Sequence, residues 1–349
     1  MENLAKGELI EELLRNYFLN LGYYVVRGVK YKYEGNDITD VDLYLYGRSS
    51  SLIRERINVD IKNKKSPQAF ERILWANGLK KLLFFDNCII ATTDTRQVIH
   101  TFGQIHDTIV LDGNFISKIK KNSYPNRLSE EDLGLAFSKC KSYKSFGKKD
   151  WRYIYEDSKS KLLSEMDYAG FNSVVVYLRY FTEKVITDVQ KREEATRMLY
   201  ILLSHLLVIM DFIIKDIAFL DSNQKIIKLK EGLNFGILGK AGVSKILQIV
   251  ETISGKSSST FYSTFESQET DILSEFFSKN ENSKILFQWS KLFESLAFEK
   301  ELITPDKIDT QLRSVMSLFL DFFKIDRKRF FNVYSTYMQT SLPLDDKKI

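Results

Sequence analysis

The chain has 349 residues, which is long for a single hydrophobic core and predicts two domains. Its formal net charge of +5 is modest, so it permits binding to nucleic acid without requiring it. Two cysteines without a Cys-x-x-Cys pair argue against a structural zinc site, and only four prolines argue against long flexible or collagen-like tracts.

The same features predict where the protein works. Residues 1–7 contain no apolar stretch, so we expect no signal peptide. The most apolar run, residues 198–210, is shorter than the roughly 20 residues that a bilayer span needs. We therefore expect a buried helix there and no membrane association. Few cysteines are typical of a reducing compartment, which favours a cytoplasmic protein.

Helices and strands alternate in the first third of the chain. Apolar residues at helical spacing predict the helices, and Gly22 and Gly78 are expected to end the first two. Ser66 is the expected N-cap of the second helix, followed by Pro67 in its first turn. In chain order we expect a helix over 4–21, strands over 23–27, 40–46 and 54–62, a helix over 67–77, a strand over 88–92, a helix over 95–102 and a strand over 108–111.

The pattern changes after residue 119. Ser129 and the three acids behind it predict a capped helix start. Basic and aromatic residues then cluster over 139–152. They could grip nucleic acid, but we favour a solvated helix end. Beyond residue 150, apolar residues at helical spacing predict helix over almost the whole chain. Thr304 and Pro305 are the expected N-cap and first residue of one of these helices. We expect helices over 171–190, 193–220, 243–253, 285–298 and 305–323.

Asp60 and Lys62 carry the most chemistry in the chain. On a strand they share one face, while Val59 and Ile61 point the other way into a core. The carboxylate can hold a divalent cation, and the lysine can orient, and even deprotonate, a water that the cation has acidified. By itself the Asp-x-Lys pattern is common as a solvated ion pair on strands.

Two acids earlier in the chain give this pattern a context. Asp42 stands at the start of the strand expected over 40–46, and Glu11 lies in the first helix. Asp40 stands two residues before Asp42, so either could be a metal ligand; we favour Asp42 because its spacing to the apolar strand residues fits better. The series Glu, Asp, Asp-x-Lys in the order helix–strand–strand–strand resembles the PD-(D/E)xK nuclease superfamily.

Within that superfamily, three segments are similar to archaeal-type Holliday-junction resolvases. They are residues 6–11 (Lys-Gly-x-x-x-Glu), 22–27 (Gly-aromatic-x-Val-Val-Arg) and 60–65 (acidic-x-Lys-x-x-Lys). Mrr-type restriction endonucleases share the same core. The resemblance covers about residues 4–112 and departs from the usual pattern twice. Val41 replaces the frequent proline, and the second acid is aspartate rather than the commoner glutamate.

The resemblance implies a restriction-endonuclease-like fold and a metal site within it. The fold has an αβββαβ core with a mixed central sheet, followed here by an all-α domain. Asp42, Asp60 and the carbonyl of Ile61 would hold Mg²⁺, with Mn²⁺ able to substitute. Glu11 would act through a water or a second ion, and Lys62 would position the nucleophile. On this basis residues 1–121 form the nuclease-like domain, 122–150 a basic connection, and 151–349 a helical domain for recognition or oligomerisation.

The resemblance also implies an activity, partners and a setting. We expect a metal-dependent endonuclease that hydrolyses DNA phosphodiester bonds, with RNA left open. Arg27, Lys64 and Lys65 would contact phosphates, or else form a plain solvated face. A homo-oligomer, a partner protein from a defence operon, and a restriction or anti-phage role are expected. The alternatives are a Holliday-junction-type resolvase, against which the large helical extension counts, and a non-cleaving nucleic-acid-binding or scaffolding subunit with a degenerate nuclease fold.

Overall fold

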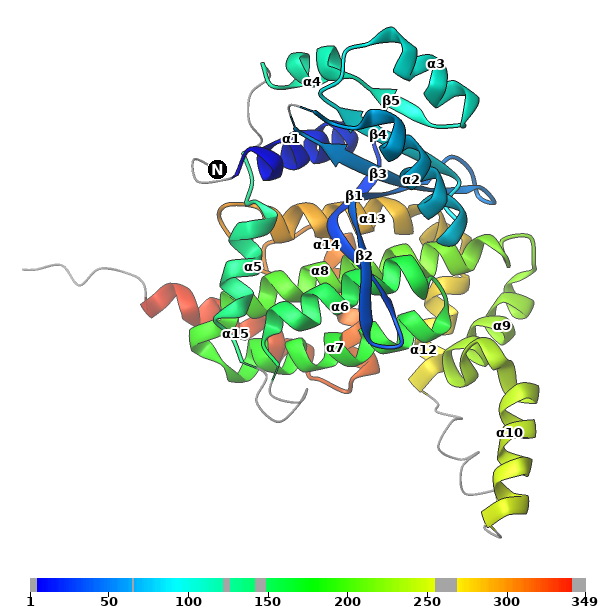
Figure 1. The fold of residues 1–349 in the computed structure, drawn as a ribbon. Helices are drawn as coiled ribbons and strands as arrows, with labels where there is room; N and C mark the ends of the chain where they lie inside the picture. The colour runs from blue at the N-terminus through cyan, green and yellow to red at the C-terminus, as the bar shows by residue number, and fades with distance from the viewer. Residues whose placement is uncertain (1–4, 65, 122–125, 142–148, 255–268, 341–349) are drawn as a thin grey trace, which may run out of the picture. The chain divides into compact units, whose positions relative to one another are not determined.

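The computed structural model describes residues 5–64, 66–121, 126–141, 149–254 and 269–340 (Figure 1). The chain divides into two compact units. One, which we call the sheet unit, comprises Met1–Met166 and Ile209–Ala218. The other, the helical unit, comprises Asp167–Val208 and Phe219–Ile349. This division differs from the boundaries expected at residues 121 and 151.

The sheet unit is built on a mixed sheet of five strands in the order β1-β2-β3-β4-β5. The first three strands are antiparallel, and β3, β4 and β5 are parallel. The strands are β1 (Tyr24–Tyr33), β2 (Asn36–Arg48), β3 (Arg54–Lys62), β4 (Asn87–Thr92) and β5 (Ile109–Leu111). The mixed sheet followed by a helical region confirms the predicted fold class at that level.

The first two strands form a hairpin longer than expected. Tyr33 pairs with Asn36, and the two residues between them, Glu34 and Gly35, both have positive φ (48° and 82°). Such a two-residue turn matches the twist of paired strands, so pairing continues to the tip. Residues 28–33 and 36–39, which lie outside the strands expected from the sequence, are therefore strand too, because exposed strand positions tolerate polar side chains.

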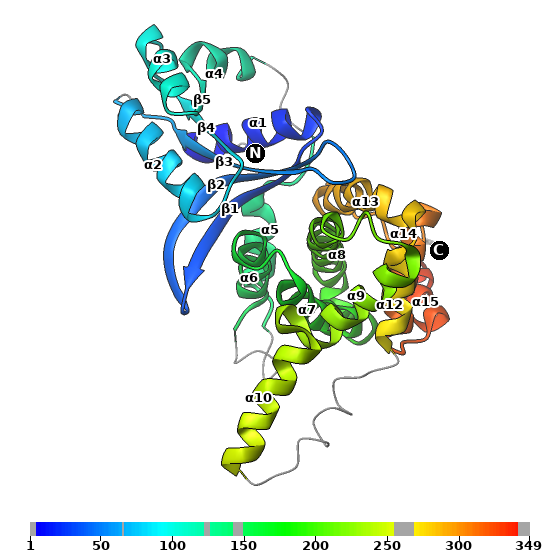
Figure 2. The ribbon, with the colours of Figure 1, turned by 90° about the vertical axis from the view of Figure 1, so that its right-hand side faces the viewer.

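Helices cover both faces of the sheet. α1 (Lys6–Asn20) and α4 (Gly113–Ile119) pack on one face, where Val59 and Ile61 point into the core as predicted. α2 (Ala69–Leu82) and α3 (Gln97–Ile105) pack on the opposite face. Figure 2 shows α1 and α2 on the two sides of the sheet.

The ends of α1 and α2 test the predicted helix signals. Gly22 follows α1 with φ 96°, a conformation that glycine adopts without strain, so the predicted stop is confirmed. The predicted start and end of α2 are wrong. Its N-cap is Gln68 rather than Ser66, and the helix continues through Gly78. Leu79 follows the glycine and is buried, and this burial stabilises the longer helix.

α5 (Glu130–Ser138) and α6 (Trp151–Ser164) belong to the sheet unit. Ser129 Oγ accepts a hydrogen bond from the Asp132 amide at 3.1 Å, which confirms the predicted cap. Trp151 is fully buried, so this aromatic of the basic segment serves packing; residues 142–148 lie outside the described part of the chain. The Arg56 guanidinium donates to the Leu163 carbonyl at 2.9 Å and ties α6 to β3.

The end of α8 (Arg192–Lys215) also joins the sheet unit, through a buried carboxylate. Asp211 accepts hydrogen bonds from Arg54 Nε at 2.5 Å, Tyr46 Oη at 2.7 Å and Arg48 at 2.7 Å. Arg54 and Asp211 side chains are both 0% exposed. Three side chains from the adjoining ends of β2 and β3 thus converge on one charge.

The helical unit contains the other α-helices of the described chain. They are α7 (Tyr168–Thr187), most of α8, α9 (Ser222–Phe235), α10 (Gly239–Ser254), α12 (Glu269–Ser278), α13 (Asn280–Phe298), α14 (Thr310–Phe322) and α15 (Arg327–Thr340). The predicted cap at Thr304 and Pro305 is wrong. α14 is capped by Asp309, which accepts from the Gln311 amide at 2.7 Å, while the Thr304 carbonyl closes a turn with Lys307.

Among the described residues, one helix, Val189–Lys215, has the length and apolar character of a membrane span. Of its most apolar stretch, 89% is buried inside the protein. That burial agrees with the core helix expected over residues 198–210.

Candidate functional site

The proposed site lies where β2 and β3 part. Their pairing ends at Leu43 and Val59, so Asp42 and Asp60 are the next residues along the two strands. In an antiparallel pair, residues in register project to the same face. Asp42 Oδ2 accepts a hydrogen bond from the Ile61 amide at 2.6 Å, so a carboxylate takes over an N–H that the ladder leaves free. The structure therefore brings the two predicted carboxylates together.

The two remaining predicted groups of β3 lie beside these carboxylates. In a strand, the N–H and C=O of one residue point to the same side, so the Ile61 carbonyl faces toward β2 together with its amide. Lys62, partly exposed on the face of Asp60, acts electrostatically on Asp42. Asp40 is exposed and also acts on Asp42, so the choice of Asp42 over Asp40 as the inner acid agrees with the geometry.

Asp60 already has a partner that the sequence did not indicate. Arg72 on α2 donates from Nε to Asp60 Oδ2 at 2.8 Å, and a second guanidinium nitrogen contacts Oδ1. This two-pronged contact occupies both oxygens of a proposed metal ligand. The sequence contained one indication of this contact, because Arg72 lies near the start of the helix that follows β3. Packing decides which residue of that helix faces the strand, so the contact itself could not be predicted.

Arg27 departs from its predicted role as a phosphate contact. Its side chain is 4% exposed, and its guanidinium pairs with Glu11 at 2.7 Å, Glu12 at 2.9 Å and Glu131 at 2.7 Å. A buried arginine shared by three carboxylates is a structural cation that holds α1, β1 and α5 together. Its effect on the site is indirect, because it fixes the Glu11 carboxylate.

The other two predicted phosphate contacts are Lys64 and Lys65. Lys64 is exposed, and its carbonyl accepts from Thr93 Oγ1 at 2.6 Å, which anchors the segment at the end of β4. Its side chain is therefore accessible to solvent. Lys65 lies outside the described residues.

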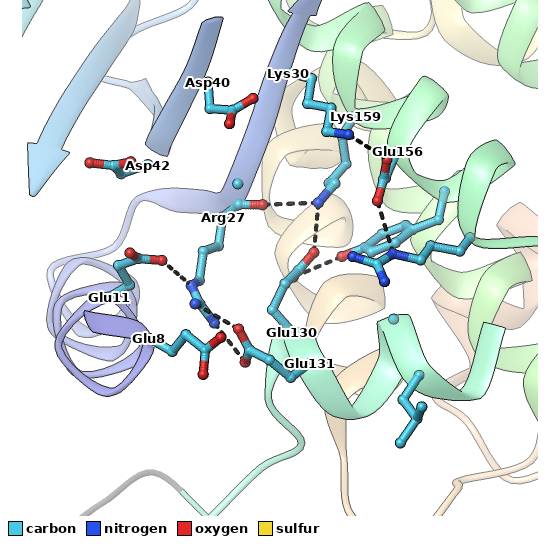
Figure 3. Close-up of a pocket in the computed structure, with 15 residues that line it drawn as sticks. Glu8, Glu11, Arg27, Lys30, Asp40, Asp42, Glu130, Glu131, Glu156 and Lys159 are labelled. Carbon is cyan, nitrogen blue, oxygen red and sulfur yellow. Dashed lines mark hydrogen bonds and ion pairs between the residues drawn. The ribbon is translucent and has the colours of Figure 1, made fainter. Parts of the chain in front are cut away.

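A pocket of about 560 Å³ opens next to Asp42 (Figure 3). Glu11, Asp40 and Asp42 line it from α1 and β2, and residues of α5 and α6 line it from the other side. Seven carboxylates and four basic side chains border the pocket, a net charge of −3. Nucleic acid would meet repulsion here unless a cation were bound as well.

Burial makes two of these carboxyls costly to ionise. It raises the pKa of Asp42 above its usual 3.8, and Asp40 adds to the rise, while the Ile61 amide, Lys62 and Arg72 oppose it. Burial likewise raises the pKa of Glu11, opposed by Arg27 and assisted by Asp42 and Glu131. Glu11 and Asp42 thus lie within electrostatic reach of each other, and a nearby cation would favour the charged form of both.

The donor set fits a hard cation such as Mg²⁺, with one condition. Mg²⁺ is usually held by one or two carboxylates plus waters and substrate phosphates. Within the described ranges, no group of three or more His, Cys, Asp or Glu is arranged as a metal site. Asp42, Asp60 and the Ile61 carbonyl would have to suffice, and Arg72 would have to release Asp60.

Asp42→Asn is expected to melt no lower than the wild type in EDTA near neutral pH. A carboxyl whose pKa is raised by folding stabilises the fold fully below its unfolded value and loses that contribution as pH rises through its folded value. Asparagine carries no such charge and still accepts from the Ile61 amide. Melting temperatures from about pH 4 to about pH 8 should therefore shift in favour of the variant. A deficit of the variant that widens with pH would contradict this.

No family model, curated protein or solved structure matches this chain.

Proposed function

We propose that this protein is a metal-dependent endonuclease that hydrolyses DNA phosphodiester bonds with Asp42, Asp60, Lys62 and Glu11. The observation that carries the proposal is the position of Asp42 and Asp60, side by side where β2 and β3 part, with Lys62 on the same face. An acidic pair at the opening of a sheet, next to a lysine, suits the hydrolysis of a phosphate diester.

A bound Mg²⁺ or Mn²⁺ would neutralise the phosphate and acidify a water. Asp42, Asp60 and the Ile61 carbonyl would hold the ion, and Lys62 would orient the attacking water by hydrogen bonding. Attack forms a new P–O bond, and the bond to the leaving oxygen breaks as that oxygen gains a proton. Glu11, held in place by Arg27, would act at longer range on the same waters.

The proposal extends to substrate and setting through the resemblance to PD-(D/E)xK nucleases. DNA is the proposed substrate, and restriction or anti-phage defence, with a homo-oligomer and a partner protein from the same operon, is the proposed setting. The resolvase alternative is less favoured. The sheet unit already contains α5, α6 and Ile209–Ala218 beyond the nuclease-like core, whereas those resolvases are little more than the core.

One observation favours a second candidate, a nucleic-acid-binding subunit that does not cut. The Asp60–Arg72 ion pair neutralises a carboxylate that the reaction needs. In a degenerate site such a pair would be permanent. In an enzyme it must open when a cation binds, so metal-dependent activity separates the two candidates.

The experiment compares substrates and metals on the full chain. Phage DNA, which offers many sequences, linear duplex, a four-way junction and RNA are each incubated with Mg²⁺, Mn²⁺, Ca²⁺ or EDTA at about 150 mM salt, where weak phosphate contacts are screened. We expect DNA cleavage with Mg²⁺ and Mn²⁺ only, because the looser geometry of Ca²⁺ positions water poorly. Binding without cleavage in every metal would favour the second candidate, and strong junction selectivity would favour the resolvase.

A further inference from the structure

Arg72 lies at the proposed site and has no part in the reaction described above. It lies on α2, above the strand face that carries Asp60 and Lys62, and its side chain is 24% exposed. Asp60 is the only carboxylate in the described parts of the chain that forms an ion pair with it. Asp42 also attracts it electrostatically. The guanidinium therefore contacts Asp60 and lies within electrostatic reach of Asp42.

Arg72 and a divalent cation would exclude each other at Asp60. Both oxygens of this carboxylate are engaged by the guanidinium, and a metal ion needs at least one of them. Positive charges a few ångströms apart also repel each other strongly near a protein surface. Metal binding would therefore release Arg72, and no second ion-pair partner among the described residues waits to receive it.

A phosphate group would satisfy the released side chain. Arginine binds phosphate oxygens in the same two-pronged manner in which it binds a carboxylate. Trp75, one turn along α2, is 48% exposed, and its ring centre lies 5.9 Å from the Arg72 guanidinium carbon. An exposed aromatic ring beside an arginine is typical of surfaces that contact nucleic acid.

We propose that Arg72 is a positioning residue with two alternating partners: it holds Asp60 in the metal-free protein, and it binds a phosphate of the substrate once a divalent cation takes Asp60. This inference rests on the proposed nuclease function and deepens it. It assigns to one side chain both the restraint on Asp60 and the neutralisation of a backbone phosphate.

The first test measures metal affinity, not activity. Arg72→Ala should bind Mg²⁺ more tightly than wild type in isothermal titration, because the competing cation is gone. If the ion pair is closed nine times in ten, the gain is about tenfold. Arg72→Lys, which keeps a charge but not the fork, should fall between the two. Binding of Mn²⁺, followed by electron paramagnetic resonance, should rank the variants in the same order.

The second test measures DNA binding in Ca²⁺, where cutting is not expected. Arg72→Ala should bind duplex DNA more weakly, and the slope of log K against log salt should become shallower by about 0.9, the value for one lost phosphate contact on B-DNA. A merely structural arginine would not change this slope by one contact while also raising metal affinity. Opposite effects on metal and DNA binding are therefore the signature of the proposal.

Arg179→Ala is the matched control. Arg179 is exposed on α7 and pairs with Glu183, so its loss removes the same charge far along the sequence from Asp60. It should leave metal affinity and salt slope at wild-type values. Should Arg72→Ala fold poorly in EDTA, Arg72→Gln, which keeps most of the side chain, replaces it.

The outcomes separate this inference from the proposed function. If wild type binds neither Mg²⁺ nor DNA, both the proposed function and this inference are overturned. If wild type binds both and Arg72→Ala matches it in metal affinity or in salt slope, the inference alone is overturned. Tighter metal binding together with a shallower slope supports it.

Discussion

Lys62→Ala is expected to cleave DNA about 10²–10⁴-fold more slowly than wild type at saturating Mg²⁺, the range typical for loss of a positioned proton-transfer group. Lys62 shares a strand face with Asp60 and stands beside the proposed cation without being one of its ligands. Mg²⁺ affinity should therefore change little. Single-turnover cleavage and isothermal titration on one preparation would measure both quantities.

Lys62 also affects Mg²⁺ binding indirectly, through the pKa of Asp42. Burial raises the pKa of Asp42, and Lys62 is one of the groups that lower it again. Removing Lys62 therefore raises this pKa further and weakens metal binding at low pH. A comparison at about pH 8 favours the charged form of this carboxyl in both proteins and so makes this effect smaller than at low pH. Lys118→Ala, an exposed lysine on α4, is the matched control. A rate for Lys62→Ala within about twofold of this control would contradict the assigned role.

Asp211→Ala is expected to lower the free energy of unfolding by about 3–5 kcal/mol, the usual cost of leaving a buried charge without its partner. Arg54 would lose its counter-ion in a fully buried position, and Tyr46 would lose its acceptor. Urea unfolding of the full chain, with melting temperature as a second probe, measures the loss. Asp216→Ala, 72% exposed and paired with Lys215, should stay within about 0.5 kcal/mol of wild type.

Asp211 also bears on the site, because it fastens the opposite end of the same strand pair. Arg48 pairs with Arg54 at the closed end of β2 and β3, and the strands part beyond Leu43 and Val59. A slip by one residue would turn Asp42 or Asp60 to the other face. We therefore expect Asp211→Ala to lose activity below its unfolding temperature too. Destabilisation under about 1 kcal/mol would show that the carboxylate is dispensable to the fold.

The strands around the site could be read from the sequence because their signals are local. Alternation placed Asp60 and Lys62 on one face and Val59 and Ile61 in the core, and the structure agrees. The positions of Asp42 and Glu11 followed from element order. The alternation needed only a short window and the period of a strand.

The features that could not be predicted depend on contacts distant in sequence. Arg27 looked like a free basic residue, but its partner Glu131 lies 104 residues away. The Lys159 ammonium reaches the Arg27 carbonyl across 132 residues, which helps to draw α6 into the sheet unit. No periodicity reveals such pairs, so the sequence did not show that α6 belongs with the sheet unit, and a buried cation was taken for a phosphate contact.

The pairing of Arg72 with Asp60 was missed for a related reason. The two residues are only 12 apart, yet their contact depends on how α2 rotates against β3. The predicted start at Ser66 was early, and Gln68, with φ 49°, begins the helix instead. Shifting a helix start by two residues turns its faces by roughly 200°, so the facing residue could not be assigned from the sequence.

The most direct test of the proposed site compares wild type with Asp42→Asn in Mg²⁺, on phage DNA and by isothermal titration. Asparagine preserves the shape and the bond from the Ile61 amide, so only the charge offered to a metal ion is lost. We predict that wild type binds Mg²⁺ and cuts the DNA, and that the variant stays folded, binds Mg²⁺ far more weakly and does not cut. Equal Mg²⁺ affinity and equal cleavage in the two proteins would contradict the assignment.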